Sequence, residues 1–169
     1  MGLAYFEIFE IPVQLNVKKS DITSTFFALS RKYHPDYYIN KTAAEQAEAL
    51  ERAALINKAY KTFQSTDATI KYVLQEKGLL ADDEKFELPS AFLMNVMDIN
   101  EALMDATDDI GKEKLLHQII EIEKDSFAPV ASIINNYQEG STTVTQLLEV
   151  KEYYYKKKYI ERIKKEMGF

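Results

Sequence analysis

The apolar residues of this chain recur at helical spacing, and the alternation typical of strands never persists. The clearest apolar face in the first part of the chain consists of Ile22, Phe26, Leu29 and Tyr33. This spacing predicts a helix of roughly three turns, and Asn16 and Ser20 both suit its N-cap position. A shorter apolar piece at 5–9 precedes Pro12, and a proline at that place predicts that the first helix is brief.

The next helix is predicted to begin at Thr42, because Thr42 and Glu45 have the spacing of a capping box. Its apolar face consists of Ala49, Ala53, Ile56, Tyr60 and Phe63. The polar stretch 65–69 interrupts this helix, and a short helix then runs toward Gly78, a residue type common at helix C-termini. The capping-box pattern recurs at 143–146, which predicts another helix start there.

The second half of the chain has the pattern of a helical bundle. A charged stretch with a proline, 79–89, is predicted to link an N-terminal domain at 1–78 to a C-terminal domain at 90–169. The helical segments expected after it are about 90–105, about 109–138 and about 143 to the end. Pro129 should kink or break the middle segment. Because short turns join these segments, we predict an all-α fold that ends in an antiparallel three-helix bundle.

Composition and charge exclude several functions. The chain has no Cys, which excludes disulfides, thiolate metal sites and cysteine nucleophiles. Residues 1–75 carry a net charge of +1 and residues 76–169 a net charge of −7, which together give −6. This balance argues against nucleic-acid binding, which needs a basic face. No run reaches the ~20 apolar residues of a membrane span, and no signal-peptide pattern is visible, so we expect a cytoplasmic location without membrane contact.

The stretch "LSRKYHPDYYIN" at 29–40 joins a helix end to a polar loop. Pro35 disfavours helical geometry at His34, so the helix is predicted to end near Tyr33. Asp36 suits bonding to backbone N–H groups of the loop. The resulting exposed, stiff, polar tip is typical of a recognition site. Taken alone, the tripeptide His-Pro-Asp also fits an ordinary turn, since Pro often follows a helix.

A catalytic or metal-binding role for the His has little support in the sequence. His117 is distant in the chain and there is no Cys, so a metal site would depend on carboxylates at ordinary spacings. No glycine-rich nucleophile turn or phosphate loop is present. We therefore expect no enzyme activity, metal or cofactor. A hydrolase that uses His34 as a base beside Asp36 stays open; it needs a concave pocket and a second polar group aimed at His34.

The motifs around this turn resemble a known family. "YFEIFEIP", "LSRKYHPD" and "INKAYKTF" follow one another in the order found in the J-domain of DnaJ-type co-chaperones. "AFLM" in the stretch 90–103, the acidic second half and the total length resemble the HscB family, the co-chaperones of iron–sulfur cluster assembly. The resemblance implies that the chain contacts a DnaK-like (HscA-type) chaperone ATPase. The contact residues that it implies are Arg31, Lys32, His34, Pro35 and Asp36.

The segment 92–105 has two apolar faces on a helical wheel. One consists of Phe92, Val96, Ile99 and Leu103, and the other of Leu93, Met94, Met97 and Met104. The second lies about 130° round from the first at 100° per residue. A wide core stripe in a bundle could absorb both faces. The abundance of Met favours a binding face instead, because Met packs adaptably against partners.

The same resemblance implies a role for this helix and for the whole chain. In HscB-like proteins it binds an IscU-type iron–sulfur scaffold protein. The matching residues are Leu93, Met94, Met97, Asp98, Glu101 and Asp105, with Tyr154 from the last helix. The implied function is that of a co-chaperone that delivers the scaffold to the chaperone, stimulates its ATPase and so assists cluster transfer. A J-domain co-chaperone for a different client is the alternative, and burial of the Met-rich face would favour it.

Overall fold

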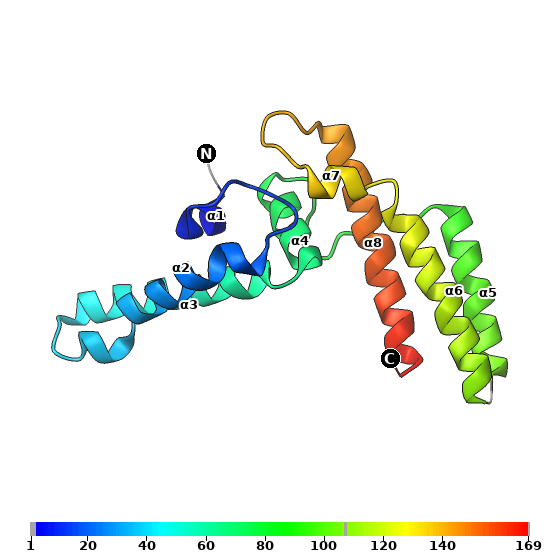
Figure 1. Cartoon of the computed structure of the whole chain (residues 1–169), viewed down its shortest axis with the longest axis horizontal. Coiled ribbons are helices and arrows are strands. Elements are labelled where there is room, and N and C mark those ends of the chain that lie inside the picture. Colours follow the sequence, from blue (N-terminus) through cyan, green and yellow to red (C-terminus); the bar gives the residue numbers. More distant parts are fainter. Residues whose placement is uncertain (1–2, 107, 169) are drawn as a thin grey trace. The chain divides into compact units, whose positions relative to one another are not determined.

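A computed structural model describes residues 3–106 and 108–168 of the chain (Figure 1). Every regular element within these two ranges is helical, which confirms the predicted all-α fold class. In chain order the elements are α1 (Ala4–Phe9), α2 (Lys19–Lys32), the 3₁₀ helix η1 (Pro35–Tyr38), α3 (Ala43–Phe63), α4 (Thr66–Glu76), α5 (Ser90–Asp105), α6 (Asp109–Phe127), α7 (Ala131–Asn135) and α8 (Val144–Glu166). None of the helices in these ranges combines the length and the apolar character needed to cross a bilayer.

The described chain divides into two compact units. Their bounds are Met1–Lys77 with Asn135–Ser141 for the first unit, and Gly78–Ile134 with Thr142–Phe169 for the second. The predicted connecting segment, 79–89, belongs to the second unit. The segment Asn135–Ser141, from the C-terminal half of the chain, belongs to the first unit. That residues 1–78 and 90–169 fold as independent domains stays a prediction.

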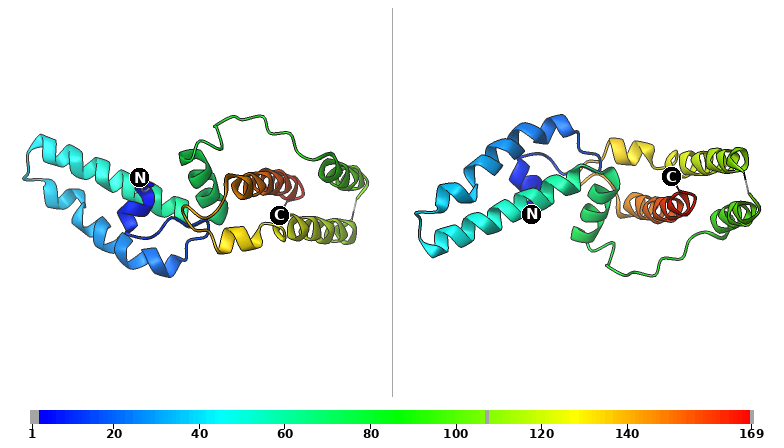
Figure 2. Two further views of the ribbon diagram at one scale, coloured as in Figure 1. Left: turned by 90° about the horizontal axis from the view of Figure 1, so that it is seen from above. Right: turned by 90° about the horizontal axis from the view of Figure 1, so that it is seen from below.

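The first unit is a helical hairpin with two short helices packed beside it. Helices α2 and α3 lie side by side and are joined by the loop that contains η1 (Figure 2). Along their seam the rings of Phe26 and Tyr60 stack with centroids 3.8 Å apart. The largest fully buried side chains of this unit are Phe6, Phe63, Leu15, Ile22, Ile70 and Leu74. The hairpin therefore has a rigid apolar base from which the loop at its far end projects.

The start of α2 differs from the prediction. Its N-cap is Lys18, in extended backbone conformation and with no side-chain cap bond, so neither Asn16 nor Ser20 caps the helix. Asn16 instead accepts a hydrogen bond from Thr66 at 3.1 Å and so lies within the fold of the first unit. Ser20 donates to the carboxylate of Asp21 at 3.0 Å.

Both predicted capping boxes are confirmed. Thr42 accepts a hydrogen bond from the backbone N–H of Glu45, whose carboxylate accepts the N–H of Thr42 at 2.9 Å. The reciprocal pair recurs between Thr143 and Gln146 at the start of α8. Each box satisfies donors that a helix start leaves without partners, which fixes where α3 and α8 begin.

The second unit is built on α5, α6 and α8, with α6 beside both other helices. Its buried cluster consists of Phe92, Val96, Ile99, Leu115, Ile119, Ile160, Ile163 and Met167. The middle segment does not continue to residue 138 as expected. Helix α6 ends at Phe127, Pro129 follows, and the separate short helix α7 begins at Ala131, so the proline breaks the helix rather than kinking it.

Two groups of ion pairs hold α8 within the second unit. Lys151 is almost fully buried and donates to Glu84 at 2.5 Å, and this bond holds the pKa of the Glu84 carboxyl below its usual range. Glu123 of α6 accepts from Lys157 at 2.8 Å and also from Lys164. Burial acts to raise the pKa of Glu123, but the bonds from the two lysines outweigh burial and lower it.

Candidate functional site

Helix α2 ends at Lys32, with Tyr33 at its C-cap, where the sequence predicts the end. The N–H of Tyr33 donates to Leu29 O at 3.0 Å, and the N–H of His34 donates to Arg31 O at 3.3 Å. His34 then takes an extended conformation with ψ 131°. The ring of the following Pro35 enforces this change, because it disfavours helical geometry in the residue before it.

His34 itself fixes the geometry of the His-Pro-Asp turn. Its Nδ1 accepts a hydrogen bond from the backbone N–H of Asp36 at 3.3 Å, and its backbone carbonyl accepts from Tyr37 N–H at 3.0 Å. The carboxylate of Asp36 lies 3.6 Å from the same Nδ1. The sequence predicted that the Asp36 side chain would bond backbone N–H groups of the loop. In the structure the His34 side chain does this instead, by accepting the N–H of Asp36.

This bond determines which atom of His34 can meet a partner. Because Nδ1 is an acceptor, the neutral imidazole carries its proton on Nε2. The His34 side chain is 54% exposed and that of Asp36 is 77% exposed. The turn thus offers one fixed N–H donor and one carboxylate to solvent, on a backbone held by the proline and by the η1 bonds.

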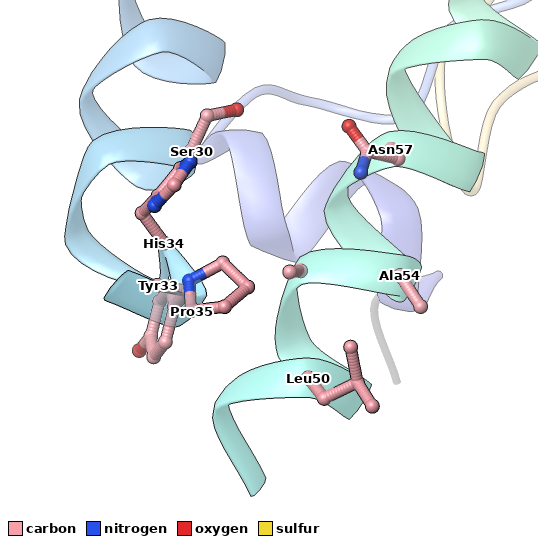
Figure 3. A pocket seen from close by; sticks show the side chains of 8 residues that line it. Ser30, Tyr33, His34, Pro35, Leu50, Ala54 and Asn57 are labelled. Atoms are coloured by element: carbon pink, nitrogen blue, oxygen red, sulfur yellow. The ribbon is translucent and has the colours of Figure 1, made fainter. Parts of the chain in front are cut away.

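Two hollows flank His34. One of about 420 Å³ lies between the end of α2 and α3, where Figure 3 shows Pro35 on one side and Leu50 and Ala54 on the other. Its lining residues with polar groups are Ser30, Tyr33, His34 and Asn57. No hydrogen bond joins Ser30 or Asn57 to His34 in the described part of the chain. The hollow is mostly apolar, so the hydrolase alternative finds a concave surface but not the second polar group aimed at His34 that it requires.

The second hollow, of about 490 Å³, brings three of the five predicted contact residues together. Arg31, His34 and Asp36 all line it. Sequence reasoning missed two further residues of this wall, Phe27 and Tyr37, which are 62% and 65% exposed. For Phe27 a signal was present, since it lies outside the apolar face Ile22, Phe26, Leu29 and Tyr33 of the predicted helix.

Lys32 is also exposed in the last turn of α2, but it does not line either hollow. Its ammonium lies 5.2 Å from the centroid of the Tyr33 ring. Lys32 therefore lies near the turn rather than inside the group formed by Arg31, His34 and Asp36.

The second candidate surface is the side of α5 that faces solvent. Phe92, Val96 and Ile99 are buried in the bundle, whereas Met94 is 66% exposed and Met97 is 54% exposed. The remaining exposed side chains of this surface are Asp98, Glu101, Met104 and Asp105. We call these residues, Met94, Met97, Asp98, Glu101, Met104 and Asp105, the α5 face. A core stripe that absorbs both apolar faces would have buried these methionines.

Two of the predicted scaffold-contact residues lie apart from the α5 face. Leu93 is half-buried and packs against the core cluster, so it belongs partly to the bundle interior. Tyr154 of α8 is half-buried, and its ring meets that of Tyr155 edge-on at 5.3 Å. The α8 ring that contacts α5 is Tyr159, which lies edge-on to Phe92 at 6.1 Å. The participation of Tyr154 in a binding face stays a prediction.

An all-α chain with an exposed His-Pro-Asp turn on a helical hairpin has the architecture of a J-domain protein. Residues 88–168 match the family model described as the HSCB C-terminal oligomerisation domain. The chain is 30% identical to the co-chaperone protein HscB of Proteus mirabilis over 66% of this chain, a match that spans 65% of that protein. It is 25% identical to the co-chaperone protein HscB homolog of Photobacterium profundum, over 85% of this chain and 88% of that protein.

A solved structure extends the comparison to the whole fold. The chaperone HscB from Vibrio cholerae superposes with a TM-score of 0.80 over 97% of this chain and 95% of its own length, at 24% identity. The sequence matches make the chain similar to the HscB-type co-chaperones, and the structural match shows that the two proteins share a fold. The match with the Proteus relative spans just under two thirds of the length of that protein.

Proposed function

We propose that this chain is an adaptor between an IscU-type iron–sulfur scaffold protein and a DnaK-like (HscA-type) chaperone. The α5 face holds the scaffold, and the His-Pro-Asp turn engages the ATPase of the chaperone. ATP hydrolysis then locks the chaperone onto the scaffold, which assists cluster transfer and the maturation of iron–sulfur proteins. The adaptor itself carries out no chemistry.

On the chaperone side, the turn acts through its fixed geometry. The Nε2–H of His34 donates, the carboxylate of Asp36 accepts, and Arg31 and Lys32 add positive charge beside them. Since the proline and the Nδ1 bond already hold the turn, little conformational freedom is lost on binding. The turn stimulates hydrolysis if it binds the hydrolysis-competent state of the chaperone more tightly than the resting state.

On the scaffold side, the α5 face combines adaptable apolar groups with fixed charges. Met94, Met97 and Met104 supply apolar area that fits an irregular partner surface. Asp98, Glu101 and Asp105 select a partner with basic groups and disfavour an acidic one. Leu93 and Tyr154 lie apart from the α5 face and are expected to contribute less.

One observation carries the proposal: a single helix buries Phe92, Val96 and Ile99 while its opposite side exposes Met94, Met97 and Met104. Burial of exposed apolar area in a partner is favourable by about 25 cal/mol per Å², so this face is suited to binding. We expect this chain to be located in the cytoplasm, together with the scaffold and the chaperone.

The test is single-turnover ATP hydrolysis by the DnaK-like chaperone of the same cell, with this protein added, with and without an IscU-type scaffold. We expect stimulation that requires His34 and that rises further with the scaffold. Stimulation indifferent to the scaffold would instead indicate a J-domain co-chaperone for a different client. No stimulation, with another J-domain protein active in the same assay, would reject the proposal.

A further inference from the structure

A cleft in the second unit gathers positive charge in the acidic half of the chain. It has a volume of about 460 Å³ and lies between the connecting segment 79–89 and α8. Its cations are Lys85, Lys158 and Arg162, and its aromatic walls are Phe86, Tyr155 and Tyr159. We call this the cationic cleft. None of its lining residues belongs to the turn or to the α5 face.

The two lysines of the cleft differ from the lysines around them. Most lysines in the same part of α8 form ion pairs with carboxylates of the chain, namely Lys151, Lys156, Lys157 and Lys164. Lys158 and Lys85 are both exposed, and neither forms an ion pair within residues 3–106 and 108–168. Their positive charges are therefore available to carboxylates of a partner.

The other charged groups of the cleft do not cancel these two charges. Glu84 is the one carboxylate among the described residues that line the cleft, and its bond to the buried Lys151 at 2.5 Å offsets both charges. Burial, and then the neighbouring Glu84, raise the pKa of Tyr155 to about 12, so this phenol stays neutral. Arg162 lies 3.9 Å from Glu166, but both side chains are mainly exposed, and such a pair is weak. The wall of the cleft is therefore net positive.

Aromatic rings supply the apolar part of the cleft. Phe86 stacks on Tyr155 with the ring centroids 4.6 Å apart, and the guanidinium of Arg162 lies 4.4 Å from the centroid of the Tyr159 ring. Leu88 adds an aliphatic group to the same lining. A ligand that fits both features carries carboxylates with an apolar or aromatic side chain beside them.

The backbone of residues 85–88, along one side of the cleft, indicates what kind of molecule carries those carboxylates. In the described part of the chain, the N–H and C=O groups of these four residues make no hydrogen bond. The segment ends in extended geometry, because Pro89 has φ −55° and ψ 136° and favours extended backbone in Leu88 before it. An extended peptide can pair with such a row of groups by strand addition, whereas a small anion uses few of them.

We propose that the cationic cleft binds an extended, acidic segment of another protein. Carboxylates of that segment pair with Lys85 and Lys158, and an apolar or aromatic side chain of the segment packs against the aromatic walls. Its backbone pairs with residues 85–88. The cleft is thus a binding surface distinct from the turn and from the α5 face, and this proposal does not depend on the proposed function.

The test is an NMR titration of the isotope-labelled full chain with a synthetic peptide, acetyl-Asp-Glu-Leu-Phe-Asp-Glu-amide. We expect saturable shifts of the backbone amides of 85–88 and of 155–162. Raising NaCl from about 50 mM to about 300 mM should weaken binding by at least about threefold, because salt screens exposed charges. A peptide with Lys at each acidic position should leave these amides unshifted.

Reversing the two lysine charges tests whether they form the contact. Lys85→Glu with Lys158→Glu should raise the dissociation constant of the acidic peptide by at least about tenfold. Lys114→Glu with Lys124→Glu makes the same change in net charge at exposed positions of α6 outside the cleft, and should raise it by less than about threefold. If the cleft variant unfolds by circular dichroism, Lys85→Gln with Lys158→Gln replaces it and should raise the dissociation constant by at least about threefold.

Several results would overturn this proposal. One is the absence of a saturable shift up to about 1 mM peptide, which corresponds to a binding free energy weaker than about −4 kcal/mol. Others are equal affinity of the native chain and the cleft variant, equal losses in the cleft variant and the α6 control, or shifts confined to the turn or the α5 face. ATP or inorganic phosphate that shifts the amides of 85–88 at lower concentration than the peptide would show that the cleft takes a small anion instead.

Discussion

The two candidate surfaces, the His-Pro-Asp turn and the α5 face, present their residues in opposite ways. The turn has few groups, and its His side chain is held by a backbone bond: His34 Nδ1 accepts the N–H of Asp36, and Pro35 restricts the chain before it. The α5 face is one side of a regular helix, whose shape is set by the buried residues on its other side. Its methionines are unbranched and largely exposed, so they can adapt to the shape of a partner.

This difference indicates two kinds of recognition. A turn with one donor and one carboxylate has little area, so its effect depends on placing those groups correctly, and a single substitution should abolish it. A helix face with methionines acts through area, so substitutions should weaken binding in steps. The His-Pro-Asp turn is suited to changing the rate of ATP hydrolysis by a partner, and the α5 face is suited to holding a partner.

The largest expected effect comes from His34→Gln. Loss of the placed Nε2–H should abolish stimulation of the chaperone ATPase in the single-turnover assay, because no other group of the turn can donate from that position. The melting temperature should stay within about 2 °C, since the side chain is mainly exposed. Lys41→Gln, an exposed change beyond the turn, is the control. A large drop in melting temperature would show that His34 is structural, and recognition through the turn would then lose its support.

Met94→Ala with Met97→Ala should weaken scaffold binding by about 10- to 100-fold, because each substitution removes apolar area that the partner would bury. Calorimetric titration with the scaffold measures this, and stimulation of the chaperone in the absence of scaffold should be unchanged. Ile110→Ala with Ile120→Ala, which changes two exposed apolar residues of α6, is the matched control. Equal affinity for the double-Met variant and the native chain would count against the α5 face.

Lys151 tests how the second unit supports its helix faces. Lys151→Ala should lower the melting temperature by about 5 °C, because it leaves Glu84 without its buried partner and removes packing over the Phe86 ring. Lys151→Met keeps the aliphatic packing and should lower it less. Thermal unfolding followed by circular dichroism distinguishes the two variants. Equal melting temperatures for native chain and both variants would mean that the pair contributes nothing to stability.

The smallest effect is a dependence of stability on pH. The folded pKa of Glu123 lies below its value in the unfolded chain, so its contribution is fully present above the unfolded value of about 4.3 and is lost as pH falls through the folded pKa. Glu123→Gln should therefore reduce the fall in melting temperature between pH 7 and pH 3.5 by about 2 °C. Exposed Glu113→Gln is the control. An unchanged pH profile in the Glu123 variant would rule out this source of acid sensitivity.

The sequence predicted the helices well because their signals are local. The apolar spacing of α2, the capping boxes of α3 and α8, and the break at Pro129 each depend on residues only a few positions apart. The start of α2 could not be predicted in the same way, because Lys18 provides no side-chain cap and the nearby Asn16 bonds to Thr66 of another helix.

The candidate sites were predictable only in part. The motif predicted where the turn lies. It did not predict that the His34 side chain caps the turn. The helical wheel identified the α5 face and placed Leu93 on it, about 40° from Met97 at 100° per residue. Only the packing of the bundle reveals that Leu93 is half-buried against the core cluster. Nothing in the local sequence distinguishes Lys151 from the other lysines of α8. Its burial depends on Glu84, which lies 67 residues earlier in the chain.

The segment Asn135–Ser141 counts with the first unit, where Tyr137 is buried and Glu139 bonds Lys77 at 2.6 Å. Glu139 follows Lys77 by 62 residues in the chain. During translation the ribosome must therefore make more than half of the second unit before the first one has all of its parts. The hairpin with the His-Pro-Asp turn emerges early but stays without this covering segment until then, so a stalled or shortened message yields the turn on an incomplete unit.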